Sequence, residues 1–139
     1  MARSGYSDDG NYALWQGAVK RALHGTRGQA FLQEMLKALD SLPQKILIPE
    51  ELQTATGEVC ALGAVGKLHG LDMGVLDPEN HQQLGKIFNI APAMVQEIEY
   101  QNDDDFSEYS YDWRTRTAET PAQRFIRMRK WVVKALEGG

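Results

Sequence analysis

The sequence predicts a mainly α-helical single domain, a bundle of about five helices with at most a minor β element. Apolar residues recur at helical spacing in most segments, and typical helix-starting and helix-ending residues bound those segments. In addition, the apolar run at 57–66 contains no residue larger than Leu62. Because small side chains let neighbouring backbones approach closely, we expect this run to form a central helix that others cover.

Composition narrows the class of protein. A chain of 139 residues with 42% hydrophobic and 24% charged residues is typical of one ordinary globular domain, here residues 1–139. The net charge of −4 argues against a surface dedicated to nucleic acid or anionic lipid. The single cysteine, Cys60, is interpreted as a small buried hydrophobe rather than a reactive thiol. Neither a membrane-spanning stretch nor a signal-peptide core is recognisable, so a cytoplasmic location is expected.

The first two predicted helices form a hairpin. One is expected from about Asn11 to His24, ending at Gly25, after a polar start at 1–10 that is expected to be ordered only if it docks. Thr26 is expected to cap the second helix, with Gln29 completing a capping box, and its apolar pattern continues to about Leu39.

The middle of the chain is predicted to contain the small-residue helix. Residues 45–48 form a short stretch that is rich in β-branched residues and flanked by prolines. This pattern favours a brief extended segment or strand, which would pair with residues near Leu52 to Thr56. Thr56 is then expected to cap the helix that runs to about His69.

Residues 78–100 carry a helix-turn-helix pattern. The triplet Asp77-Pro78-Glu79 is typical of a helix start, Asn89 can adopt the left-handed conformation that ends a helix, and Pro92 starts the next. The small Gly85 would let the two helices cross closely. The favoured interpretation is two packed helices within the bundle.

The alternative function for this pair is a DNA-binding transcriptional regulator. Early positions of a recognition helix must reach the bases, and here those positions are Ala91, Ala93 and Gln96. The neighbouring acids would repel phosphates instead of releasing counterions. DNA binding is therefore the second hypothesis.

Acidic and aromatic residues gather after the second of these helices. Residues 96–112 contain seven acids and no lysine or arginine. A surface of aromatic anchors among carboxylates suits a protein partner with a basic surface. The predicted partner-binding residues are Asp103, Asp104, Asp105, Phe106, Glu108, Tyr109, Tyr111 and Trp113. Alternatively, the basic side of the last helix neutralises this segment within the chain.

The last helix has the strongest start signal. Thr120 is the expected cap, Pro121 occupies the first position and Gln123 completes a capping box. The basic residues are expected largely on the side opposite its apolar stripe: Arg124, Arg127, Lys130 and Lys134, with Arg129 nearby.

Catalytic and metal-binding signatures are not apparent in the sequence. The nucleophile-elbow, P-loop, CxxC and HExxH motifs are absent, and the three histidines share no metal-ligand spacing, so neither a cofactor nor a metal is predicted. An enzyme of unknown class is the third hypothesis, with Arg27, Asn102 and Asp103 converging.

Five sequence motifs support a family resemblance. They are Arg27-Gly-Gln-Ala-Phe-Leu32, Leu39-Asp40, Val59-Cys-Ala-Leu-Gly-Ala-Val-Gly66, Tyr100-x-Asn102-Asp103 and Glu119-Thr-Pro-x-x-Arg124-Phe-x-x-Met-Arg129-x-Trp131. With them the chain resembles a family of small hypothetical proteins encoded by tailed phages and prophages. The resemblance implies a mainly helical accessory protein that acts in a bacterial cytoplasm. The leading hypothesis is a non-catalytic protein-interaction module that engages a host nucleic-acid-binding or defence complex through the acidic segment. Homo-oligomer formation stays open.

Overall fold

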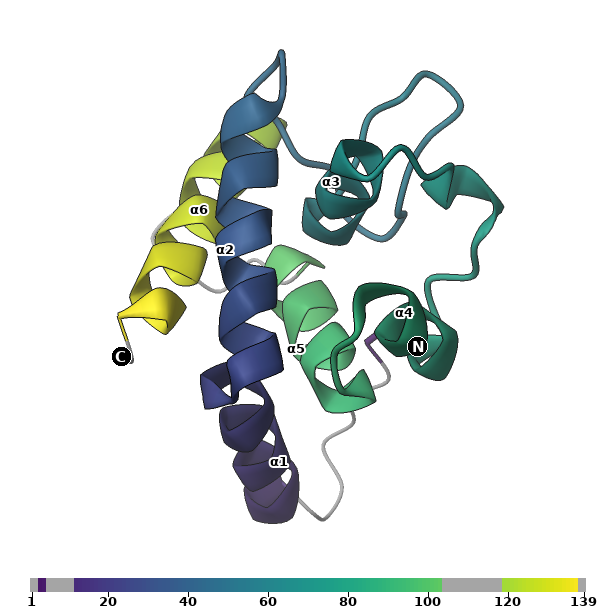
Figure 1. Cartoon of the computed structure of the whole chain (residues 1–139). Helices are drawn as coiled ribbons and strands as arrows, with labels where there is room; N and C mark the ends of the chain where they lie inside the picture. The colour runs from purple at the N-terminus through teal and green to yellow at the C-terminus, as the bar shows by residue number, and fades with distance from the viewer. Residues whose placement is uncertain (1–2, 5–11, 104–118, 138–139) are drawn as a thin grey trace, which may run out of the picture.

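The structure is a computed structural model that describes residues 3–4, 12–103 and 119–137 (Figure 1). Over these ranges the chain forms a mainly α single domain with no β-strand, as the sequence predicts. These ranges contain six helices and one 3-10 turn, where about five helices were expected. The elements are α1 (Tyr12–His24), α2 (Thr26–Ser41), α3 (Ala61–Leu68), the 3-10 turn η1 (Met73–Val75), α4 (His81–Phe88), α5 (Pro92–Asp103) and α6 (Pro121–Leu136).

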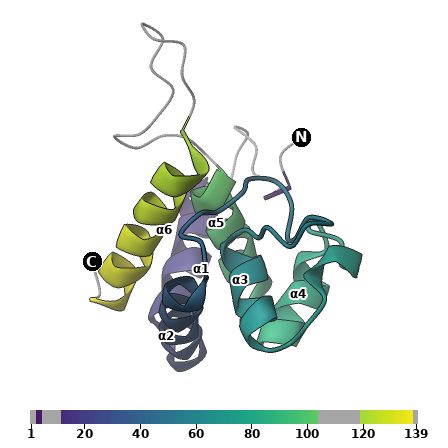
Figure 2. The same cartoon turned by 90° about the horizontal axis from the view of Figure 1, so that it is seen from above.

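Helix α5 is the most widely packed element of the bundle. It contacts α1, α3, α4 and α6, while α2 packs against α1, α3 and α6. Seen from above, α5 lies between the α1, α2 and α6 side and the α3 and α4 side (Figure 2). Groups on α5 can therefore meet groups from almost every part of the fold.

Helix α3 is covered, as its small residues predict. Leu62 is fully buried in the core. An added Cβ at Gly63 would lie 1.9 Å from the carbonyl oxygen of Leu52, so the two backbones approach as closely as only glycine allows. The predicted start of this helix at Thr56 is wrong, because the chain turns first and Cys60 takes the capping position, with its sulfur accepting from the Gly63 amide.

The turn before α3 contains the β-type pairing that the sequence suggested near residues 45–56. Gly57 has a positive φ of 91°, and Gln53 and Val59 form one isolated antiparallel bridge. The Ile48 amide donates to the Val59 carbonyl at 3.0 Å. This pairing is too short to make a strand, so residues 45–48, expected as an extended segment or strand, form a loop.

Several helix boundaries match the predicted ones. Thr120 and Gln123 form the full capping box of α6. Asn89 ends α4 in the left-handed region with φ 56°. An added Cβ at Gly85 would lie 2.7 Å from the Ile90 carbonyl oxygen, which confirms the close approach at the α4–α5 corner.

Besides Thr56, two more predicted helix starts are wrong. At α4, the Asp77 carboxylate accepts from the Glu79 amide in a preceding turn, and the helix begins only after Asn80, whose side chain accepts from the Gln83 amide. At α2 the capping residue is Gly25, without a side-chain cap. The Gln29 side chain extends instead toward the carbonyls of Leu23 and Ala135, to which its amide nitrogen donates.

Candidate functional site

Ionisable side chains meet inside the bundle, around the last turn of α5. Because Arg, Asp and Glu are rarely buried unless paired, this cluster is the candidate functional site. It has two parts, which we name the arginine clamp (Glu119, Arg124 and Arg127) and the Arg3 pocket (Arg3, Cys60, His81, Glu99 and Asp103). Within the described residues, the buried polar and charged side chains are those of Arg3, Ser4, Glu99, Asn102, Glu119, Arg124 and Arg127.

The arginine clamp closes the C-terminal end of α5. Arg127 donates to the carbonyls of Gln101 and Asn102, and Arg124 donates to those of Asn102 and Asp103. The last carbonyls of a helix have no intrahelical donor and carry partial negative charge, which two guanidinium groups satisfy well.

Glu119 neutralises the clamp. Its carboxylate accepts two hydrogen bonds from Arg127, at 2.7 and 3.0 Å, and lies 3.3 Å from Arg124 Nη1. A two-pronged arginine–carboxylate pair is among the stronger protein hydrogen-bond arrangements. The clamp therefore joins the end of α5 to the start of α6.

Asn102 connects the clamp to the small-residue helix. Its Oδ1 accepts from the Ala61 amide at 3.0 Å, which is an otherwise unpaired donor in the first turn of α3. Its Nδ2 donates to the Ile48 carbonyl and to Asp103 Oδ1. One buried amide thus fixes α5, α3 and the 45–60 loop relative to one another.

The Arg3 pocket holds a guanidinium group from the start of the chain. Arg3 donates to Asp103 through Nε at 2.7 Å and through Nη2 at 2.8 Å. Its Nη1 points to Cys60 Sγ at 3.7 Å and lies 3.7 Å from Glu99 Oε2. Burial disfavours the charged form, but Cys60, Asp103 and Glu99 outweigh burial and hold the Arg3 pKa above its usual value.

His81 and Glu99 form the floor of this pocket. His81 Nε2 lies 2.7 Å from the Arg3 carbonyl oxygen and 2.8 Å from Glu99 Oε1. A carbonyl oxygen only accepts, so Nε2 carries a proton and donates to both oxygens. Glu99 Oε2 is buried and has no hydrogen-bond partner among the described residues. Burial raises the pKa of Glu99 to about 8, against the opposing charge of Arg3.

This pKa predicts how stability depends on pH. The folded chain binds a proton on Glu99 more tightly than the unfolded chain does. The resulting stabilisation is complete below the ordinary pKa of 4.5 and is lost as the pH rises through about 8. The glutamine of the variant Glu99→Gln cannot ionise, so we expect the stability of the variant relative to the wild type to increase by about 4 kcal/mol between about pH 5 and about pH 9. Urea unfolding at each pH measures this difference.

The exposed Glu51→Gln supplies the control for that measurement, because its carboxyl lies outside the cluster. The difference in free energy of unfolding between Glu51→Gln and the wild type should be constant across the same pH range. A constant offset for Glu99→Gln as well would contradict a raised Glu99 pKa.

The predicted partner-binding residues divide into two groups. Asp103 is in the Arg3 pocket, and its side chain is only 9% exposed. Of the seven acids at 96–112, Glu99 is also buried. The other predicted residues lie outside the described part of the chain: Asp104, Asp105, Phe106, Glu108, Tyr109, Tyr111 and Trp113.

The positions predicted for DNA contact lie just before α5 and in its first turns. Ala91 and Ala93 are half-buried, and Gln96 donates to the Ser4 carbonyl at 3.1 Å. Arg27 and Asn102, which were considered for an enzyme site, do not form a hydrogen bond with each other. Arg27 donates instead to Asn89 Oδ1 on the exposed side of the α4–α5 corner.

The basic residues of α6 do not form one open face. Arg124 and Arg127 were expected on the polar side, and that prediction is wrong: both are buried, because they bind the end of α5. Arg129 pairs with Asp40 of α2 at 2.7 Å, and this contact holds the pKa of the Asp40 carboxyl below its usual value. Lys134 is exposed.

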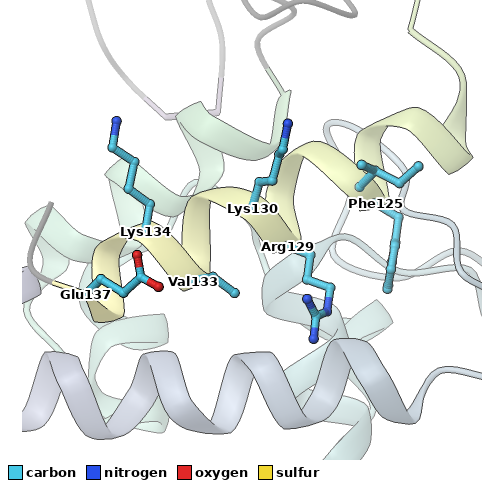
Figure 3. A pocket seen from close by; sticks show the side chains of 7 residues that line it. Phe125, Arg129, Lys130, Val133, Lys134 and Glu137 are labelled. Atoms are coloured by element: carbon cyan, nitrogen blue, oxygen red, sulfur yellow. The ribbon is translucent and has the colours of Figure 1, made fainter.

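A shallow hollow of about 470 Å³ lies on the outer side of α6. Arg129 points toward α2, whereas Lys130 and Lys134 point away from it (Figure 3). The lining combines apolar and charged side chains: Phe125, Ile126, Arg129, Lys130, Val133, Lys134 and Glu137. No member of the clamp or the Arg3 pocket lines this hollow, so it is a separate feature.

Sequence reasoning missed the buried cluster. Cys60 is buried, as expected, but it also caps α3 and faces Arg3. Amphipathic patterning gave no sign that Glu99, Arg124 and Arg127 would be internal. The available signal was the set of motifs on which the phage resemblance rests, because Cys60, Asn102, Asp103, Glu119 and Arg124 all belong to the cluster or contact it.

The fold and the cluster define a mainly α-helical protein with an internal ionic network. No protein-family model matches the sequence, and neither a curated protein nor a solved structure matches it significantly. In the described ranges, no group of three or more histidine, cysteine or acidic side chains is placed to hold a metal ion. No described helix has the length and apolar character that crossing a membrane requires.

Proposed function

We propose that the protein is a non-catalytic interaction module of the phage and prophage type. In this proposal its acidic, aromatic segment binds a protein with a basic surface, such as a host nucleic-acid-binding or defence complex. Because Asp103 is used inside the fold, the proposed contacts begin at Asp104 and continue to Trp113. The resemblance to phage-encoded accessory proteins supports a bacterial partner.

The observation that carries the proposal is the arginine clamp. Arg124 and Arg127 bind the backbone on the near side of residues 104–118, and Glu119 on the far side. The segment therefore departs from and returns to one buried, rigid base. Binding residues commonly lie on segments that a rigid scaffold positions.

Aromatic and acidic residues in this segment supply the expected chemistry. Tyrosine and tryptophan are enriched among residues that dominate binding energy, and carboxylates steer a basic partner and exclude acidic ones. A partner that binds nucleic acid has a basic surface of its own, which a protein carrying this segment could occupy.

The DNA-binding alternative has less support. Helix α5 packs against four other helices, and Gln96 already holds the N-terminal backbone. A regulator would bind duplex DNA at low salt with an affinity that falls steeply as salt increases. Electrophoretic mobility shifts at low and moderate salt test this alternative.

Affinity capture from a bacterial lysate tests the proposed function. The wild type is compared with D104N/D105N/E108Q, which keeps side-chain size and removes three charges. We expect capture of a basic protein to fall at least about tenfold in the variant, which corresponds to about 1.4 kcal/mol. Purified partner and titration calorimetry then give the affinities.

A matched variant controls for net charge. E51Q/E58Q/E137Q removes three acids at exposed positions outside the segment. It should capture the partner as the wild type does. Equal capture by both triple variants, or no enrichment by the wild type, would count against the interaction.

A further inference from the structure

The Arg3 pocket has the composition of a binding site for an arginine-containing peptide. Asp103 presents both carboxylate oxygens to one guanidinium group, at 2.7 and 2.8 Å. The fork of an arginine matches this geometry, whereas a lysine ammonium is a single point charge that cannot span both oxygens equally. The pocket therefore distinguishes between the two basic side chains.

The pocket also binds the backbone of its occupant. His81 Nε2 contacts the Arg3 carbonyl oxygen at 2.7 Å, and Gln96 Nε2 donates to the Ser4 carbonyl at 3.1 Å. These donors come from α4 and α5, on either side of the short segment (Figure 1). Recognition of one side chain and two successive carbonyls is characteristic of peptide binding.

The pocket is assembled without the residues that fill it. Asp103 Oδ1 also accepts from the Glu50 amide at 3.0 Å and from Asn102 Nδ2 at 2.9 Å, so the carboxylate is oriented before Arg3 arrives. Cys60 is fixed as the cap of α3. None of these contacts depends on residues 3–4, and the pocket walls should persist when the side chain of Arg3 is removed.

One polar atom in the pocket is left without a donor. Glu99 is fully buried, and its Oε2 has no hydrogen-bond partner among the described residues, although Arg3 Nη1 is 3.7 Å away. Buried carboxylate oxygens are normally satisfied. A guanidinium group seated slightly deeper could donate to Glu99 as well as to Asp103.

From these observations we infer that Cys60, His81, Gln96, Glu99 and Asp103 form a binding site for a peptide arginine, which Arg3 occupies from within the chain. An arginine from outside can enter the same site when Arg3 is absent. This inference does not depend on the acidic segment or on its partner.

Chemical rescue of the full-length Arg3→Ala chain tests the inference. Cys60 is buried beneath Arg3, so the rate at which an aryl disulfide reagent modifies its thiol reports whether the pocket is filled. We expect this rate to rise at least about tenfold in Arg3→Ala. Adding N-ethylguanidinium should return it to within about twofold of wild type along a saturable curve.

N-ethylammonium at equal ionic strength is the matched probe, and it should leave the rate of Arg3→Ala unchanged. A second control is R3A/D103N, which lacks the fork-binding carboxylate and should not respond to N-ethylguanidinium. Absence of rescue, or equal rescue by the two cations, would overturn the inference.

Arg3→Lys is a second variant that tests the inference if Arg3→Ala does not fold. Lysine retains the charge and most of the aliphatic stem, so this variant should fold. Its thiol should nevertheless react faster than that of the wild type, because one ammonium cannot replace the fork. Wild-type protection of Cys60 in Arg3→Lys would contradict a site selective for arginine.

Discussion

Arg127→Met is expected to lower the free energy of unfolding by about 3–5 kcal/mol, which is the usual effect of breaking a buried ion pair from one side. The variant removes two hydrogen bonds to Glu119 and leaves the carbonyl of Gln101 without its arginine donor. Methionine preserves most of the apolar stem, so the loss reports the charge and its hydrogen bonds. Urea unfolding followed by far-ultraviolet circular dichroism measures the change.

Arg129→Met is the matched control, two positions along the same helix. Arg129 pairs with Asp40 at the surface, where both side chains are more than two-fifths exposed. Exposed pairs contribute little, so this variant should unfold close to the wild-type midpoint. Comparable losses in the two variants would mean that the clamp does not act as a buried unit.

Gly63→Ala is expected to lower the free energy of unfolding by a similar amount, about 3–5 kcal/mol, because the added methyl group pushes the backbone of α3 away from that of Leu52. The new methyl group would lie 1.9 Å from the Leu52 carbonyl oxygen and 3.0 Å from the Val59 Cβ. Neither neighbour is the end of a flexible side chain, so α3 must move away from the 45–60 loop. Differential scanning calorimetry of the variant measures the loss.

Gly66→Ala gives the comparison within the same helix. Its methyl group would meet the Met73 side chain at 2.3 Å, and methionine can adopt another rotamer. A smaller loss of about 1–2 kcal/mol is expected there. Gly17→Ala in α1 would meet only the end of the Arg21 side chain, so it should stabilise the helix by about 0.5–1 kcal/mol. An equal loss at Gly63 and Gly66 would refute the close backbone contact.

Local signals predicted the parts of the fold that local interactions determine. The capping box at Thr120 and the left-handed Asn89 each depend on atoms within a few residues, and both are confirmed. Thr26 and Asp77 carry the same kind of signal and gave wrong helix starts. The Gln29 amide nitrogen binds the Leu23 carbonyl, and the Asp77 carboxylate closes a turn that precedes the helix.

The cluster could not be predicted because its partners are distant in sequence. Arg3 is 100 positions from Asp103, and Arg127 is 26 positions from Gln101. The periodicity of apolar residues places an arginine on the solvent side of a helix. It carries no information on whether the carbonyl groups at the end of another helix can accept hydrogen bonds from that arginine. The acids at 96–112 were likewise counted as one surface, although Glu99 and Asp103 face inward.

The position of Arg3 has a consequence for synthesis on the ribosome. Arg3 is synthesised 100 residues before its carboxylate partner, Asp103. The arginines that cap α5 emerge later still. A nascent chain therefore keeps Arg3 without its carboxylate partner until Asp103 has emerged, and a chain released before Arg127 lacks the contacts that close the bundle.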